Sequence, residues 1–165
     1  MHVFDSQPLK PLTARDQTRQ VFDSEPLTSL MLASALRPSR LFVVEDSDVV
    51  RALWRTVVDK IAGLSLAAEF NRASTAIAAI RREPPDIVLL DIHLSEGDGM
   101  DVLRVVAAEY PMTKVVVVSN CSDPIFRRYF ARAGAYAFYD KSHELPAMRA
   151  TLERLAWVES PASLS

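Results

Sequence analysis

The sequence is poor in cysteine, and neither sign of charge is in large excess. Cys121 is the single cysteine among 165 residues, which excludes an intrachain disulfide and suits a reducing cytosol. The formal net charge is −2, so the chain has neither the positive field that nucleic acid attracts nor a basic patch for an anionic membrane. We therefore expect no direct binding of nucleic acid.

Long apolar stretches are also missing. No run approaches the roughly 20 residues of a membrane-spanning helix. The first residues lack the basic segment and apolar run of a signal peptide. A hydrophobic share of 49% beside 24% charged residues is typical of a globular protein, and the length suits one domain with extensions. We expect a cytoplasmic protein without membrane insertion.

Residues 1–39 differ from the rest of the chain. They contain four prolines, no glycine and little periodicity. The heptapeptide VFDSQPL at residues 3–9 returns at residues 21–27 as VFDSEPL. Two interpretations stay open: a duplication without function, or two copies of a short docking motif whose linkage raises avidity. We predict a flexible N-terminal extension over residues 1–39.

From Arg40 onward, apolar runs alternate with helical patterns. Val49, Leu53, Val57 and Ile61 recur at every fourth residue, which predicts a helix from Asp48 to Ile61 with these side chains on one face. Further helices are predicted from a cap at Ser74 to Ile80, over Met100–Glu109, from a cap at Asp123 to Gly134, and from a cap at Ser142 to about Trp157. The predicted strands are Leu41–Val44, Leu64–Phe70, Ile87–Leu90, Lys114–Val118 and Tyr136–Tyr139.

Strand and helix thus alternate five times. Continuous Val, Ile and Leu runs are typical of strands buried on both faces, so we predict an α/β fold with a parallel sheet between two layers of helices. In such folds the functional crevice lies at the carboxyl ends of the strands.

Polar side chains follow four of the five predicted strands. Glu45 and Asp46 come after the first strand, Asp91 after the third, Ser119 after the fourth, and Lys141 just past the fifth. Clustered carboxylates repel one another, and a hard divalent cation such as Mg²⁺ relieves that cost. Lys141 adds a positive charge that suits an incoming phosphoryl oxygen.

These residues resemble the receiver domain of bacterial two-component response regulators. The similar pieces are Val-Val-Glu45-Asp46, Leu-Leu-Asp91-Ile-His-Leu with Gly99 eight residues on, Val-Val-Ser119-Asn, and Gly134-Ala-Tyr-Ala-Phe138-Tyr-Asp-Lys141. The resemblance implies a flavodoxin-like (βα)5 fold, doubly wound, with a five-stranded parallel sheet in the order 2-1-3-4-5. We assign the receiver domain to residues 40–158 and a C-terminal tail to residues 159–165.

The resemblance implies a metal-assisted phosphoacceptor. Asp91 is expected to accept the phosphoryl group. Mg²⁺ is expected to be held by Glu45, Asp46 and Asp91, together with the backbone carbonyl of His93.

The resemblance also implies how the phosphoryl group is held and sensed. Ser119 and Lys141 are expected to hold phosphoryl oxygens, and Ser119 and Phe138 are expected to act together as the switch. His93 and Cys121 flank the phosphoryl position, so we expect them to tune the lifetime of the phosphorylated form.

The partners implied are a sensor histidine kinase or phosphotransfer protein as donor and a downstream protein as target. We expect a stand-alone receiver without a DNA-binding output domain. It is expected to be no enzyme beyond catalysing its own phosphorylation and dephosphorylation. The last two helices and the last strand are the expected homodimer face, which includes Arg127, Arg128, Tyr129, Tyr136, Phe138 and Met148.

Three other functions compete with this hypothesis. A pseudo-receiver that binds partners without phosphorylation would not need the intact acids and Lys141. A haloacid-dehalogenase-type phosphatase needs a second Asp at the position of His93. A flavodoxin-type flavin carrier needs a phosphate-cradling loop, whereas the first loop here is the acidic stretch from Glu45 to Asp48.

Overall fold

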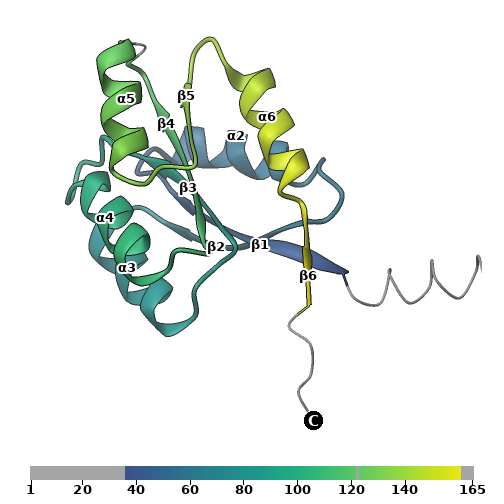
Figure 1. The fold of residues 1–165 in the computed structure, drawn as a ribbon. Coiled ribbons are helices and arrows are strands. Elements are labelled where there is room, and N and C mark those ends of the chain that lie inside the picture. The colour runs from purple at the N-terminus through teal and green to yellow at the C-terminus, as the bar shows by residue number, and fades with distance from the viewer. Residues whose placement is uncertain (1–35, 122, 161–165) are drawn as a thin grey trace, which may run out of the picture. The chain divides into compact units, whose positions relative to one another are not determined.

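The computed structural model describes residues 36–121 and 123–160 (Figure 1). The heptapeptide repeat and most of the predicted extension, residues 1–35, lie outside the described residues, as do residues 161–165 of the predicted tail. The strands are β1 (Leu36–Val44), β2 (Leu64–Phe70), β3 (Ile87–Asp91), β4 (Lys114–Ser119), β5 (Ala137–Asp140) and β6 (Trp157–Glu159). The helices are α2 (Asp48–Val58), α3 (Ala73–Arg82), α4 (Gly99–Glu109), α5 (Pro124–Arg132) and α6 (Leu145–Arg154). No helix among the described residues has the length and apolar character that a membrane crossing requires.

The five main strands form a parallel sheet in the order β2-β1-β3-β4-β5, which confirms the predicted flavodoxin-like topology. The register aligns Asp91 at the end of β3 with Val118, and Ser119 at the end of β4 with Asp140. The carboxyl ends of these strands therefore meet at one edge of the sheet.

The strand residues divide between two hydrophobic cores, one on each face of the sheet. Leu41, Val43 and Leu89 face α2 and α6, whereas residues next to them in the strands, such as Phe42 and Val88, face α3 and α4. This alternation follows from the two-residue period of a β-strand. Figure 1 shows the resulting layers, with α2 and α6 on one side of the sheet and α3, α4 and α5 on the other.

The helix α2 ends at Val58, before the predicted end at Ile61, and its buried face differs from the predicted stripe at Val49 and Leu53, whereas Val57 packs against the core and Ile61 is buried. Val49 and Leu53 are 80% and 44% exposed, whereas Trp54 and Val58 are buried. Val50, Trp54 and Val58 also recur at every fourth residue, so the periodicity alone fits either stripe. The structure buries the stripe that contains Trp54, whose large ring removes the most apolar area from water.

Two predicted helix caps are also wrong. The N-cap of α3 is Arg72 rather than Ser74, and no side chain caps that helix end. The N-cap of α6 is Glu144 rather than Ser142, because Pro146 in the first turn favours a start at that point. Ser142 instead donates its N–H to Asp140, at 2.7 Å from the carboxylate oxygen.

A sixth strand replaces the predicted end of the last helix. The helix α6 ends at Arg154, and Trp157–Glu159 form β6, which pairs antiparallel with Leu36–Pro38 at the start of β1. The indole ring of Trp157 covers Gly63, where an added Cβ would lie 2.2 Å from the ring atom Cε2. The regular fold thus begins before the predicted boundary at Arg40, and β6 includes the first residue of the predicted tail.

Candidate functional site

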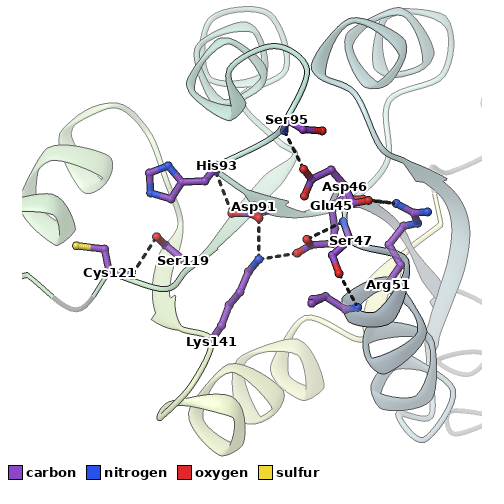
Figure 2. Close-up of polar contacts among 11 residues, drawn as sticks. Glu45, Asp46, Ser47, Arg51, Asp91, His93, Ser95, Ser119, Cys121 and Lys141 are labelled. Atoms are coloured by element: carbon purple, nitrogen blue, oxygen red, sulfur yellow. Dashed lines mark hydrogen bonds and ion pairs between the residues drawn. The ribbon is translucent and has the colours of Figure 1, made fainter.

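The sequence-predicted site residues come together at the carboxyl edge of the sheet (Figure 2). Glu45 and Asp46 follow β1, Asp91 ends β3, Ser119 ends β4, and Lys141 follows β5. Parallel strands deliver their carboxyl ends to one edge, so residues far apart in the sequence become neighbours.

Three carboxylates form the centre of the site. Oxygens of Glu45, Asp46 and Asp91 all lie within 4.8 Å of one another. Glu45 and Asp91 are buried, with exposed fractions of 1% and 5%. Carboxylate oxygens at this spacing are the donors that a hard divalent cation such as Mg²⁺ prefers, so these residues fit such an ion.

Lys141 is the positive partner of the buried acids. Its Nζ atom lies 2.6 Å from Oε2 of Glu45 and 2.7 Å from Oδ2 of Asp91. Burial alone would lower the pKa of Lys141, but its hydrogen bonds to Asp91 and Glu45 raise the pKa above its ordinary value. Burial raises the pKa of Glu45, and Lys141 offsets this only in part. One ammonium against three carboxylates leaves two negative charges, which is the charge that a divalent cation would balance.

The loop after β3 contributes backbone N–H groups to two of the acids. Ser95 N–H donates to Asp46 at 2.8 Å, and His93 N–H donates to Asp91 at 3.0 Å. Burial alone would raise the pKa of Asp46, but the hydrogen bonds from Ser95 outweigh it and hold that pKa below its ordinary value. The peptide of His93 therefore lies beside Asp91, and metal ligation by its carbonyl stays a prediction.

Gly99 lets α4 begin close to Asp91. Its N–H donates to the carbonyl of Ile92 at 3.2 Å, and an added Cβ would lie 2.4 Å from the carbonyl oxygen of Asp91. Any side chain at this position would push the helix away from the end of β3 and disturb the loop that carries Asp91.

A cleft of about 580 Å³ opens beside the acids. Ser119, Cys121 and His93 line it near the site, and Phe126 and Tyr129 of α5 line its far side. Ser119 is buried, and its Oγ accepts a hydrogen bond from the N–H of Cys121 at 3.2 Å. Ser119 and Cys121 therefore lie side by side on the wall of this cleft.

The expected switch residue Phe138 is buried on β5, with an exposed fraction of 8%. Its ring stacks on Phe130 with a centroid separation of 5.4 Å, and the guanidinium of Arg127 lies 5.1 Å from the ring centroid. Arg127 also donates to the carbonyl of Phe138 at 3.0 Å. These contacts hold the ring inside, and the predicted coupling of its motion to Ser119 stays a prediction.

The predicted partner face is only partly at the surface. Tyr129 and Tyr136 are 49% and 47% exposed, and Arg128 is exposed as well. Met148 and Phe138 are buried, so they lie beneath this face and not on it. Use of these elements as a dimer face stays a prediction, and only the exposed side chains among those named could take part in it.

Sequence reasoning missed Arg51. The guanidinium of this α2 residue donates to the backbone carbonyls of Glu45 and Asp46, and it pairs with Asp48 (Figure 2). The sequence does place this arginine one helical turn after Ser47, which directly follows the two acids and is the N-cap of α2. A cation at that position can fold back over the loop that precedes its own helix.

A family model described as "Response regulator receiver domain" matches residues 41–153. This range covers more than half of the 165-residue chain and includes every residue of the site.

Two curated relatives illustrate the sequence similarity. A protein-glutamate methylesterase/protein-glutamine glutaminase from Cereibacter sphaeroides is 35% identical over 91 residues, which cover 54% of this chain and 25% of that protein. The response regulator GacA from Pseudomonas viridiflava is 28% identical over 109 residues, covering 66% of this chain and 51% of that protein. The chain spans between a quarter and a half of the length of these relatives, so the activity of either whole protein does not carry over.

Solved structures share the fold. The response regulator domain of Thermotoga maritima CheB superposes with a TM-score of 0.63 at 22% identity, covering 72% of this chain and 94% of that one. The Mn²⁺-bound form of the response regulator Rcp1 gives a TM-score of 0.58 at 18% identity, covering 72% and 91%. At these identities the likeness concerns the fold alone.

Replacing Lys141 with methionine tests the charge balance of the site. The variant keeps the aliphatic stem but leaves the carboxylates of Glu45 and Asp91 facing each other without an ammonium. Removal of one partner of a buried ion pair costs about 3–5 kcal/mol, so we expect a loss of about 3 kcal/mol in the free energy of unfolding without metal. Urea denaturation at mildly alkaline pH measures it, and added Mg²⁺ should restore part of the loss.

The exposed Lys60→Met variant is the control for that experiment, because it removes a lysine that lies away from the acids. Equal stability losses in the two variants would contradict the proposed charge balance, and so would a Lys141→Met loss that Mg²⁺ leaves unchanged.

Proposed function

Because this chain belongs to the response regulator receiver family, we propose that Asp91 accepts a phosphoryl group from a sensor histidine kinase or a phosphotransfer protein. The proposed cofactor is Mg²⁺, held by the carboxylates of Glu45, Asp46 and Asp91. The observation that carries the proposal is the buried acid cluster with Lys141 at 2.7 Å from the acceptor carboxylate. The proposed place of action is the bacterial cytoplasm, which the family resemblance implies.

The proposed reaction is a transfer between two nucleophiles. A carboxylate oxygen of Asp91 attacks the phosphorus in line, the new O–P bond forms, and the P–N bond of the donor phosphohistidine breaks. The donor imidazole leaves with the electron pair of that bond. Attack of water on the phosphorus later releases inorganic phosphate and restores the carboxylate.

The residues around Asp91 suit the charge that develops during transfer. The Lys141 ammonium is already within hydrogen-bond distance of the acceptor and is placed to bind a phosphoryl oxygen. The hydroxyl of Ser119 would donate to another oxygen. Bound Mg²⁺ would supply positive charge beside the phosphoryl oxygens. The response regulator Rcp1, a neighbour in fold, is known in an Mn²⁺-bound form, which is consistent with a divalent cation in this proposal.

The chain is proposed to signal and not to process a metabolite. Its catalysis is limited to its own phosphorylation and dephosphorylation. Movement of Ser119 toward the phosphoryl group would free space beside Phe138, and the displaced ring would alter α5 and β5. The output is then a change in protein contacts, made to a downstream protein or to a second copy of the chain.

Substitution of Asp91 tests the acceptor. After incubation of the full chain with acetyl phosphate and Mg²⁺, intact-mass analysis should find one added phosphoryl group on the native protein. Asp91→Asn should show none, because the amide lacks the nucleophilic carboxylate oxygen. The exposed Asp59→Asn variant is the matched control and should be modified like the native protein. A native chain that stays unmodified would favour the pseudo-receiver, which binds partners without phosphorylation.

The side chains of His93 and Cys121 are predicted to limit access of water to the acyl phosphate, since both line the cleft beside Ser119. Alanine at either position should shorten the half-life of the phosphorylated form by about threefold, a barrier change below about 1 kcal/mol. Loss of phosphate from the purified phosphoprotein measures the rate. His143→Ala, at a residue outside the lining of this cleft, is the control, and unchanged rates in both cleft variants would refute the idea.

Phosphorylation is predicted to promote a homodimer through α5, β5 and α6. Sedimentation velocity with Mg²⁺ and beryllofluoride, a phosphoryl mimic, should show a dimer that is absent without the mimic. Tyr129→Arg should weaken this dimer, because it places a charge on an exposed aromatic position of the face. Met112→Ala changes an exposed side chain elsewhere and should not weaken it. A monomer under all conditions would contradict the dimer.

A further inference from the structure

Arg51 lies at the back of the acidic loop that joins β1 to α2. One guanidinium nitrogen, Nη1, donates to the carbonyl of Glu45 at 2.6 Å and to the carbonyl of Asp46 at 3.1 Å. The other, Nη2, pairs with the carboxylate of Asp48. The Arg51 side chain is 13% exposed, so its contacts to the two carbonyls are partly shielded from water, whereas Asp48 is 90% exposed and its ion pair lies at the surface. Arg51 thus binds the main chain of both acids and leaves their carboxylates to the site.

The peptide groups of the loop are fixed from both sides. Glu45 N–H donates to the carbonyl of Phe70 at 2.9 Å, while its own carbonyl accepts from Arg51. Ser47 N–H donates to the Glu45 carboxylate at 3.2 Å. With both backbone groups of Glu45 engaged, the direction of its side chain is set before a cation arrives.

Arg51 also opposes the charge of the loop. Glu45, Asp46 and Asp48 place three acids within four residues, and close like charges disfavour a compact turn. The view in Figure 2 shows the Arg51 guanidinium and the Lys141 ammonium approaching Glu45 from opposite sides. Lys141 offsets part of the negative charge of the carboxylates inside the site, whereas Arg51 binds the main-chain carbonyls behind them.

We propose that Arg51 is a positioning residue that preorganises Glu45 and Asp46 for a divalent cation. This inference rests on the metal site of the proposed function. Without the guanidinium, the carbonyls of both acids lose their shared donor, and the loop must be reordered when the cation binds. The free-energy cost of reordering the loop reduces the net free energy of cation binding, so the cation binds more weakly. A lysine has a single ammonium in place of the planar guanidinium with its two donor nitrogens, so it replaces these contacts only in part.

The test measures metal binding directly. Full-length protein is titrated with Mn²⁺, and the electron paramagnetic resonance signal of the free ion gives the dissociation constant without any phosphorylation. We expect Arg51→Met to raise this constant about tenfold and Arg51→Lys to raise it by a smaller factor. Arg55→Met is the matched control, one turn further along α2, because Arg55 pairs with Glu69 and touches no acid of the site. It should stay within about twofold of the native value.

Urea denaturation of the metal-free variants separates positioning from stability. A purely structural role would lower the unfolding free energy in Arg51→Met and leave the Mn²⁺ dissociation constant of the folded protein unchanged, which would overturn the inference. If Arg51→Met does not fold, Arg51→Lys decides: a native dissociation constant in that variant overturns the inference, and a raised one supports it. Failure of the native protein to bind Mn²⁺ would instead overturn the metal site itself.

Discussion

The structure depends on an imbalance of charge at one edge of its sheet. Three carboxylates from two strand ends lie within 4.8 Å of one another, and the ammonium of Lys141 offsets only part of their charge. Burial raises the pKa of Glu45 despite this partner, so the cluster is costly without a further cation. The same negative surplus that makes the cluster costly would be offset by a divalent ion, which is the basis of the proposed metal site. In the proposed function, a bound ion and Lys141 would both place positive charge beside Asp91, which suits a transferring phosphoryl group.

The rest of the fold holds this arrangement in place. The parallel register brings Asp91 and Ser119 to the same edge, and two hydrophobic cores fix the strands from both faces. Gly99 lets α4 begin in contact with the backbone of Asp91. At the opposite end of the sheet, β6 pairs with the start of β1, and the Arg37 guanidinium binds Asp86 at 2.6 and 2.9 Å. The ends of the described segment are therefore tied to the strand that carries the acidic loop.

The topology could be predicted from the sequence because β3, β4 and the second half of β1 are continuous apolar runs, each with a polar residue at its end or just after it. Other features left no such local signal. The stripe of Val49 and Leu53 has the same period as the stripe of Trp54 and Val58, so only packing distinguishes them. The three-residue strand β6 exists because it pairs with residues about 120 positions earlier, and Arg51 acts through main-chain carbonyls that a sequence does not display.

A crystal structure of the full chain with Mn²⁺ and beryllofluoride tests the charge balance at Asp91 most directly. Anomalous scattering would locate the metal. The account predicts one Mn²⁺ among the carboxylates of Glu45, Asp46 and Asp91, with beryllofluoride on Asp91 in contact with Lys141 and Ser119. An ion bound elsewhere, or an Asp91 that carries no beryllofluoride while Lys141 keeps both of its carboxylate partners, would contradict it.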